Sequence, residues 1–260
     1  MIQIPIFQID AFADRPFTGN PAAVMPLQEW LPDPVMQAIA AENNLSETAF
    51  LVPEGEGYRI RWFMPVGEID LCGHATLASA YVVLNELRPG EQRVVFQSMS
   101  GPLAVTRDGD LYTLDFPTRA PRPVPCPPGF AEALGAPVKE AWLNRDLFAL
   151  LEDEAAVRDL KPDMSALERL EPSSFVVTAP GTDSDFVSRC FCPREGIPED
   201  PVTGSTHCVL APYWAQRLGK TRFRARQLSK RGGVLYCEVQ GDRVAISGRA
   251  VLVMKGLMVL

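Results

Sequence analysis

The sequence predicts an α+β fold of two similar halves, each rich in strands and built around one buried helix. Three observations predict this fold class. A short segment around Gly73 is repeated around Gly204, and each copy leads into an apolar helix. Strand-like stretches predominate in both halves. A proline-rich stretch, residues 117–129, lies between the two halves. Together these features argue against the regular strand–helix alternation of a Rossmann-type domain.

The repeated segment reads Glu68-Ile-Asp-Leu-Cys-Gly-His-Ala-Thr in one copy and Glu199-Asp-Pro-Val-Thr-Gly-Ser-Thr-His in the other. Both copies run from an acid through a short β-type stretch and Cys or Thr to Gly and the start of a helix. The glycines are 204 − 73 = 131 positions apart, about half of the 260-residue chain. The chain has only two histidines, His74 and His207, and both fall in these segments. The repeat therefore suggests two similar halves that face one shared site.

In the first half, alternating apolar and polar residues predict strands, and two stretches predict helices. The helix over 33–43 has Asp33 as its expected N-cap and Pro34 at its first position. The helix over 75–87 is apolar on nearly every side, which is typical of a helix buried inside a curved sheet. The loop expected here covers 14–21, and the expected strands are 2–12, 47–52, 58–63, 94–96, 103–107 and 111–116.

The second half repeats this pattern after the proline-rich stretch, which is the expected interdomain linker. We therefore expect an N-terminal half over 1–117 and a C-terminal half over 118–250. Pro212 predicts that the helix over 205–218 is kinked or shortened. The other elements expected here are a helix over 164–170 and strands over 142–151, 174–178, 186–191, 222–228, 233–240 and 244–253.

Charge and composition exclude several classes of function. The net charge is −7 and no block of Lys and Arg occurs, so a nucleic-acid partner is not expected. No apolar run reaches the roughly 18–20 residues of a membrane helix. The N-terminus alternates like a strand and lacks the marks of a signal peptide. The six cysteines have no regular spacing, which favours free thiols in the cytoplasm.

The two glycines of the repeat are candidates for binding an anion. Gly73 and Gly204 lie where a strand gives way to a helix, and glycine allows a ligand to approach the backbone there. The free N–H groups and the dipole of each helix favour a carboxylate. Two ordinary tight turns would produce the same pattern. If the two glycines do bind an anion, the substrate is a small molecule that carries a carboxylate.

Three further residues are candidates for acid–base chemistry. Glu47 follows a polar turn and precedes the apolar run Ala49-Phe-Leu-Val, so it is a candidate base that is partly removed from water. His74 is a candidate proton carrier, and Asp200 a candidate for orienting an amine or hydroxyl. The alternatives are a solvated glutamate at a strand edge and polar residues that cap helices.

Metal and nucleotide cofactors are not predicted. Cys72, His74, His207 and Cys208 do not have the spacing of the usual zinc motifs. The sequence contains no Gly-x-Gly-x-x-Gly or Walker-type loop.

Several ordered motifs resemble the phenazine-biosynthesis isomerase (PhzF-like) family, which has the diaminopimelate-epimerase-like fold. The resemblance covers nearly the whole chain. It is carried by Phe17-Thr-Gly-Asn-Pro-Ala-Ala-Val, Leu45-Ser-Glu-Thr-Ala-Phe, Arg61-Trp-Phe-Met-Pro, Cys72-Gly-His-Ala-Thr, Ser100-Gly-Pro-Leu-Ala-Val, Asp185-Phe-Val-Ser-Arg, Glu199-Asp-Pro-Val-Thr-Gly-Ser-Thr-His and Lys230-Arg-Gly-Gly.

This resemblance implies two pseudo-symmetric domains, each a curved, mainly antiparallel sheet around a central helix, with the active site in the cleft between them. It implies that the last strand, about 251–260, returns to the first domain and that the protein is a homodimer. It also implies a cofactor-independent isomerase in which Glu47 moves a proton, helped by His74 and Asp200. The residues implied to bind substrate are Asn20, Gly73, Gly204 and Ser205.

Two positions depart from the family pattern. Epimerases of the wider fold place a cysteine before each of the two glycines, whereas this chain has Cys72 and Thr203. A two-thiol epimerase is therefore disfavoured, but a Cys/Thr pair resembles related dehydratases, so an epimerase or dehydratase that uses Cys72 is an alternative. Met64 replaces a more usual Thr and leaves the substrate open. A protein that binds a small carboxylate without chemistry is a further alternative.

Overall fold

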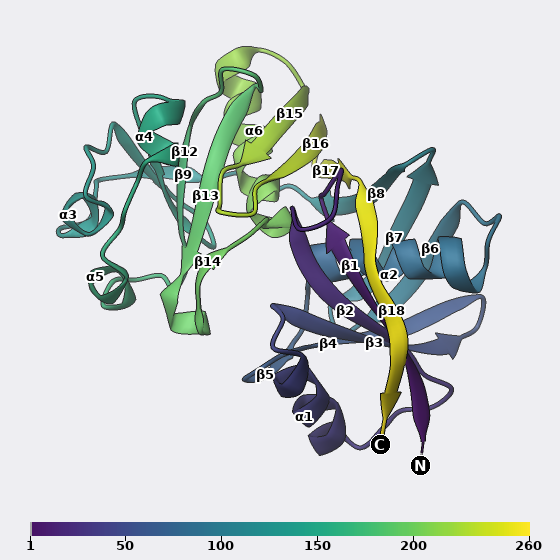
Figure 1. Cartoon of the computed structure of the whole chain (residues 1–260). Helices are drawn as coiled ribbons and strands as arrows, with labels where there is room; N and C mark the ends of the chain where they lie inside the picture. The colour runs from purple at the N-terminus through teal and green to yellow at the C-terminus, as the bar shows by residue number, and fades with distance from the viewer. Residues whose placement is uncertain (1) are drawn as a thin grey trace. The chain divides into compact units, whose positions relative to one another are not determined.

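The computed structural model describes residues 2–260 of the chain, which form two compact units (Figure 1). Unit 1 consists of the residues up to Asp115 together with Ser247–Leu260, and unit 2 is Phe116–Ile246. Within the described residues, no helix combines the length and apolar character needed to span a membrane.

Unit 1 is a mixed sheet, mostly antiparallel, whose strands follow the order β18-β1-β2-β3-β4-β6-β7-β8. The short strand β5 pairs with β4 beside β6. The pairs β2–β3 and β4–β6 are parallel. The strands are β1 (Gln3–Ala11), β2 (Asn20–Pro26), β3 (Glu47–Glu54), β4 (Gly57–Met64), β5 (Gly67–Ile69), β6 (Arg93–Ser98), β7 (Gly101–Asp108), β8 (Leu111–Pro117), which crosses the unit boundary, and β18 (Ala250–Val259).

Unit 2 has the same pairing order, β9-β10-β11-β12-β13-β15-β16, with β14 on β13. Its parallel pairs are β11–β12 and β13–β15. The strands are β9 (Arg122–Val124), β10 (Glu140–Leu143), β11 (Leu147–Leu150), β12 (Phe175–Pro180), β13 (Phe186–Cys192), β14 (Ile197–Asp200), β15 (Arg222–Gln227), β16 (Gly233–Gln240) and β17 (Arg243–Gly248), which also crosses the boundary.

The two units repeat one another strand for strand. Strands β1 to β7 correspond to β10 to β16 in order and in direction, and the outer strand β18 corresponds to β9. The predicted fold class, α+β with two similar halves, is confirmed. The expected linker contains β9, and the loop expected over 14–21 ends at the start of β2.

One long helix follows the short strand in each unit. Helix α2 (Gly73–Val82) has eight buried residues of ten and continues as a π-helical turn, η1 (Val83–Leu87). Helix α6 (Gly204–Leu218) covers the expected range and contains Pro212, which does not shorten it. The remaining helices are α1 (Asp33–Asn43), α3 (Phe130–Leu134), α4 (Glu154–Arg158), α5 (Met164–Glu168) and the 3-10 turn η2 (Pro193–Glu195).

The acid that opens each repeated segment forms an ion pair with an arginine on the neighbouring strand. Arg61 on β4 contacts both carboxylate oxygens of Glu68, at 2.6 and 2.7 Å. Arg189 on β13 does the same with Glu199, at 2.7 and 3.0 Å. Bidentate pairs of this kind fix the geometry of both partners. The repeated acids therefore hold the strands that lead into α2 and α6.

Asp33 does not cap α1 as predicted. It is the first helical residue, the N-cap is Pro32, and no side chain caps the helix. The Asp33 carboxylate instead accepts a hydrogen bond from Arg61 at 2.8 Å. Asp33 still lies in the first turn, where a negative charge interacts favourably with the helix dipole. It therefore stabilises the start of the helix by its charge rather than as an N-cap.

Candidate active site

Glu47 is placed by the turn that ends α1. Asn44 adopts a left-handed conformation, φ 49°, and its N–H bonds the carbonyl of Ala40, which closes the helix. Asn tolerates this conformation better than most residues. The chain then enters β3, and Glu47 is the first residue of that strand, opposite Ala22 of the parallel strand β2. The Glu47 side chain is buried at this end of the strand.

Asn20 is placed by an equally tight turn before β2. Gly19 has φ 65°, and a Cβ at this position would lie 2.2 Å from the carbonyl oxygen of Ala11. Only glycine fits that approach. Asn20, the next residue, is fully buried and pairs with Ala11 of β1.

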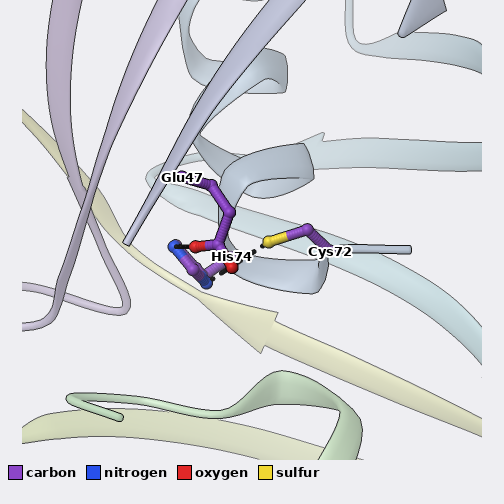
Figure 2. A group of neighbouring side chains, drawn as sticks. All are labelled: Glu47, Cys72 and His74. Atoms are coloured by element: carbon purple, nitrogen blue, oxygen red, sulfur yellow. Dashed lines mark hydrogen bonds and ion pairs between the residues drawn. The ribbon is translucent and has the colours of Figure 1, made fainter. Parts of the chain in front are cut away.

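His74, in the first turn of α2, lies between Glu47 and Cys72 (Figure 2). It also contacts Asn20. Its Nε2 is 2.9 Å from Oε2 of Glu47. Its Nδ1 is 3.2 Å from Nδ2 of Asn20 and 3.5 Å from Sγ of Cys72. An amide nitrogen only donates hydrogen bonds, so Nδ1 is the acceptor in the neutral ring and Nε2 carries the proton. The contact of Nε2 with Glu47 is a close ion pair when the ring is protonated. The histidine thus orients the carboxylate.

Burial and charge act in opposite directions on His74. Burial by itself would lower the pKa of the imidazole, but the anionic forms of Cys72 and Glu47 raise the pKa well above its ordinary value. Burial, with Glu47 adding to it, raises the pKa of the Cys72 thiol. The thiol is therefore neutral near pH 7, and the charge that favours the imidazolium is that of Glu47.

Glu47, Cys72 and His74 carry atoms of the types that bind metal ions, and these atoms lie within 4.8 Å of one another. The imidazole, however, stands between its partners, with Nε2 toward Glu47 and Nδ1 toward Cys72 (Figure 2). One ion binds only one ring nitrogen, so a common metal would require His74 to turn away from one partner. The arrangement is that of a chain of polar contacts, an ion pair on one side of the ring and hydrogen bonds on the other, rather than a chelate.

The second group of candidate residues surrounds the start of α6 in unit 2. Thr203, the N-cap of this helix, donates its hydroxyl to Oδ2 of Asp200 at 2.5 Å. Gln227 accepts from the N–H of Thr203 at 2.9 Å and donates to the carbonyl of Asp200 at 2.8 Å. Gly204 and Ser205 open the helix directly after this group. The threonine at the position of Cys72 is thus tied to the Asp200 carboxylate.

His207 has a structural role in the same helix. Its Nδ1–H donates to the carbonyl of Thr203 at 2.8 Å, four residues back. In α2, the hydroxyl of Thr76 makes the same bond to the carbonyl of Cys72. The His207 ring stacks on Phe186, with centroids 5.9 Å apart, and burial lowers its pKa to about 4. His207 is therefore neutral and supports the helix start, as the capping alternative described.

Gln227 is a site residue that the sequence reasoning missed. It lies at the end of β15, where the inward positions are Phe223, Ala225 and Gln227. A polar residue at an inward position of an alternating strand is an available signal, because a buried amide requires partners. That signal would have pointed to the Asp200 group.

Comparisons with known proteins show which family the chain belongs to. Residues 9–256 match the PhzC-PhzF model, described as phenazine biosynthesis-like protein. An uncharacterized isomerase of Pseudomonas aeruginosa is 51% identical over 257 residues, covering 99% of both chains. A PhzF family protein of Enterococcus faecalis superposes with a TM-score of 0.98 at 52% identity, covering 100% of both chains.

A more distant structure shares the fold alone. A probable proline racemase of Agrobacterium radiobacter has a TM-score of 0.67 at 12% identity, with 99% of this chain and 93% of that chain covered. The fold is therefore that of the PhzF and epimerase-like proteins, as the resemblance implied. With its whole length matched and its relatives named as isomerases, the chain belongs to the phenazine biosynthesis-like (PhzC-PhzF) family and is an enzyme of the isomerase class.

Proposed function

We propose that the enzyme is a cofactor-independent isomerase that moves a proton on a small, carboxylate-bearing substrate, with Glu47 as the acid–base group. The observation that carries the proposal is the buried Glu47–His74 contact of 2.9 Å. A carboxylate held by an imidazole in a dry site has a fixed orientation and few competing water molecules. Both are needed for a group that must take up and release the same proton.

In the proposed reaction, the Glu47 carboxylate takes a proton from one substrate carbon. The electron pair of the broken C–H bond shifts into a neighbouring double bond, and Glu47 returns the proton to another carbon on the same face. The product is an isomer, so atoms and electrons balance. His74 holds the carboxylate in place, and its Nδ1 is in turn held by Asn20.

We propose a carboxylate-binding position at the start of the long helix of each unit. Gly73 opens α2 and Gly204 opens α6, and the first N–H groups of a helix have no partner within it. The Ser205 hydroxyl would add a donor. Asp200, held by Thr203, would orient a substrate hydroxyl or amine. We further propose that the enzyme works in the cytoplasm.

The test is proton NMR in deuterated water with trans-2,3-dihydro-3-hydroxyanthranilate, the substrate that the PhzF-like resemblance suggests. We expect the wild type to convert it and to exchange solvent deuterium into the product. Glu47→Gln should fold normally and lose at least about 100-fold in rate, in the usual range for loss of a general base. Glu54→Gln, an exposed carboxylate at the other end of β3, is the matched control. Undiminished turnover by Glu47→Gln would contradict the assignment.

The alternative is an epimerase or dehydratase in which Cys72 is the base. The contact of 3.5 Å between Sγ and the His74 imidazole favours it, since the imidazole could accept the thiol proton. The raised pKa of the buried thiol disfavours it. Cys72→Ala separates the two: it abolishes a thiol-dependent reaction and spares one that depends on Glu47. A binding protein without chemistry would bind small carboxylates but exchange no substrate proton.

A further inference from the structure

Two thiols of unit 2 lie in contact inside the protein and take no part in the proposed reaction. Cys190 and Cys192 lie on β13 with one residue between them, a spacing that puts two side chains on the same face of a strand. Their sulfur atoms are 3.7 Å apart. Both residues are buried, with 1% of Cys190 and 7% of Cys192 exposed. The sulfurs of a disulfide are about 2.0 Å apart, so a small movement would join these two.

The backbone at Cys192 permits such a movement. Cys192 is the last residue of β13, and the register with β14 shifts between Phe191 and Cys192. A register shift of this kind bends a strand and interrupts its ladder. Cys192 also lies beyond the last pair between β12 and β13. It is therefore less constrained by the sheet than Cys190, which lies opposite Val176 of β12 and Asp200 of β14.

Hydroxyl groups link the two thiols to a buried carboxylate. The Cys192 thiol donates to the Ser174 hydroxyl at 3.6 Å, and this hydroxyl also lies 3.6 Å from the sulfur of Cys190. The Thr206 hydroxyl lies 3.9 Å from the sulfur of Cys190 and donates to Asp146 at 3.2 Å. Burial raises the pKa of Asp146, while hydrogen bonds from the hydroxyls of Thr206 and Ser174 lower it. Each hydroxyl thus connects a thiol with a group that can accept its proton.

This cluster occupies in unit 2 the position that Glu47 occupies in unit 1. Arg61 of β4 and Arg189 of β13 are equivalent, since each holds the acid of a repeated segment. Each arginine lies opposite a residue that comes three positions after Glu47 in one unit and three positions after Ser174 in the other. The place of the candidate base is therefore taken by a buried hydroxyl that contacts two thiols. Unit 2 is equipped at this position for a different chemistry.

We propose that Cys190 and Cys192 form a site of reversible oxidation, at which a hydroperoxide converts the two thiols to a disulfide. Cys192 is the attacking thiol, because it is the more exposed of the two and lies at the end of the strand. Its proton passes through the Ser174 hydroxyl to Asp146, and the thiolate that remains is the nucleophile. This modification goes beyond the proposed isomerase reaction and does not depend on it.

The reaction balances in two steps. The Cys192 thiolate attacks one oxygen of hydrogen peroxide: an S–O bond forms, the O–O bond breaks, and the departing hydroxide takes the proton from Asp146 to become water. The Cys190 sulfur then attacks the Cys192 sulfur: the S–S bond forms, the S–O bond breaks, and the second hydroxide takes the Cys190 proton. Two thiols are oxidised and one peroxide is reduced to two water molecules. The disulfide closes a very short segment, so chain entropy stabilises it little and a thiol reductant can reverse it.

The test is mass spectrometry after treatment with hydrogen peroxide, alkylation of the remaining thiols in denaturant, and digestion with trypsin. Arg189 and Arg194 place both cysteines in the peptide 190–194. We expect this peptide to lose alkylation and to become lighter by two hydrogen atoms, and dithiothreitol to restore alkylation. Cys208 and Cys237 are the internal control, because both are buried and burial raises the pKa of each thiol. Their alkylation should be lost at least about 10-fold more slowly.

Two variants test the assigned roles. Cys190→Ser removes the second thiol, so Cys192 should stop at the sulfenic acid, which dimedone traps. Asp146→Asn removes the proton acceptor and should slow disulfide formation at pH 7 at least about 10-fold. Asp159→Asn, which alters an exposed carboxylate of unit 2, is the matched control and should be oxidised at the wild-type rate. An unchanged rate in Asp146→Asn would overturn the assigned proton acceptor.

Two results would overturn the site itself. In one, the peptide 190–194 keeps both alkyl groups at a peroxide concentration that oxidises Cys126, an exposed thiol of the same chain. In the other, the thiols of this peptide are lost no faster than those of Cys208 and Cys237. That result would show that peroxide reaches all of these thiols only when the protein unfolds.

Discussion

The two histidines of the chain should respond to pH in opposite ways, and His207 offers the sharper test. Burial lowers its pKa to about 4, from an ordinary value of 6.5. Between these two values the unfolded chain binds a proton at His207 and the folded chain does not. The free energy of unfolding must therefore fall as the pH falls through this window, and His207 contributes no further loss below it.

The size of this effect follows from the two pKa values. One pKa unit corresponds to about 1.36 kcal/mol, so the difference between 6.5 and about 4 predicts a loss of about 3 kcal/mol. In the wild type, His207 Nδ1–H donates to the carbonyl of Thr203. His207→Asn removes the titrating ring, and the asparagine amide can still donate to the same carbonyl. The smaller side chain also leaves a cavity beside Phe186, which lowers stability by the same amount at every pH.

The assay is urea unfolding of both proteins at intervals from pH 7 to pH 4. The carboxylates common to both proteins cancel in the difference between them, so we expect the wild type to lose about 3 kcal/mol more than His207→Asn. His74→Asn is the control and should keep the wild-type acid slope, because the pKa of His74 is raised and its window lies above pH 6.5. If the free energy of unfolding of the wild type and of His207→Asn fell equally from pH 7 to pH 4, the reasoning would be refuted.

Three further predictions concern the site and its supports. Asn20→Ala should lower kcat about 10-fold with a smaller change in KM, because His74 Nδ1 loses the Asn20 amide that positions the ring; steady-state kinetics on any substrate that the enzyme turns over would check this. The stability that the His74–Glu47 pair contributes is fully present below pH 6.5 and is lost as the pH rises through the raised pKa of His74. The free energy of unfolding should therefore fall less between pH 6 and pH 9 in Glu47→Gln than in the wild type, as urea unfolding at the two pH values would show. Arg189→Met should cost about 3 kcal/mol in thermal or urea unfolding, because Glu199 is left without its partner in a largely buried position. Arg222→Met, whose ion pair is exposed, should cost less than about 1 kcal/mol, and equal losses for the two would show that burial does not set the difference.

The sequence was most informative where a pattern repeats. The paired segments around Gly73 and Gly204 predicted two similar halves, and the apolar helix after Gly73 predicted a buried helix; the structure confirms both. The pattern could not show that Glu68 and Glu199 form ion pairs with arginines on neighbouring strands. That function depends on the register of β4–β5 and β13–β14, which is set by tertiary pairing.

Local signals failed where tertiary structure overrides them. The prolines of 117–129 predicted a linker but did not reveal that the stretch also contains β9, which includes Pro123 because an edge strand tolerates a residue without an N–H. The sequence predicted one strand over 244–253, but β17 ends at Gly248 and β18 begins at Ala250. In the candidate site, the residue types were evident from the sequence, whereas the order Glu47–His74–Cys72 is set by the packing of β3 against α2. The catalytic and binding roles assigned to these residues remain predictions.

The division of unit 1 between the two ends of the chain sets the order in which a ribosome completes the units. Unit 2 is one continuous segment, Phe116–Ile246, and all of it is synthesised before β18. Domains usually fold from the N-terminus during synthesis, whereas here the N-terminal unit must wait for the last ten or so residues. Until then, one edge of β1 lacks its partner strand and is open to pairing with other chains. A nascent chain that ends near residue 249 should therefore contain a folded unit 2 and an incomplete, aggregation-prone unit 1.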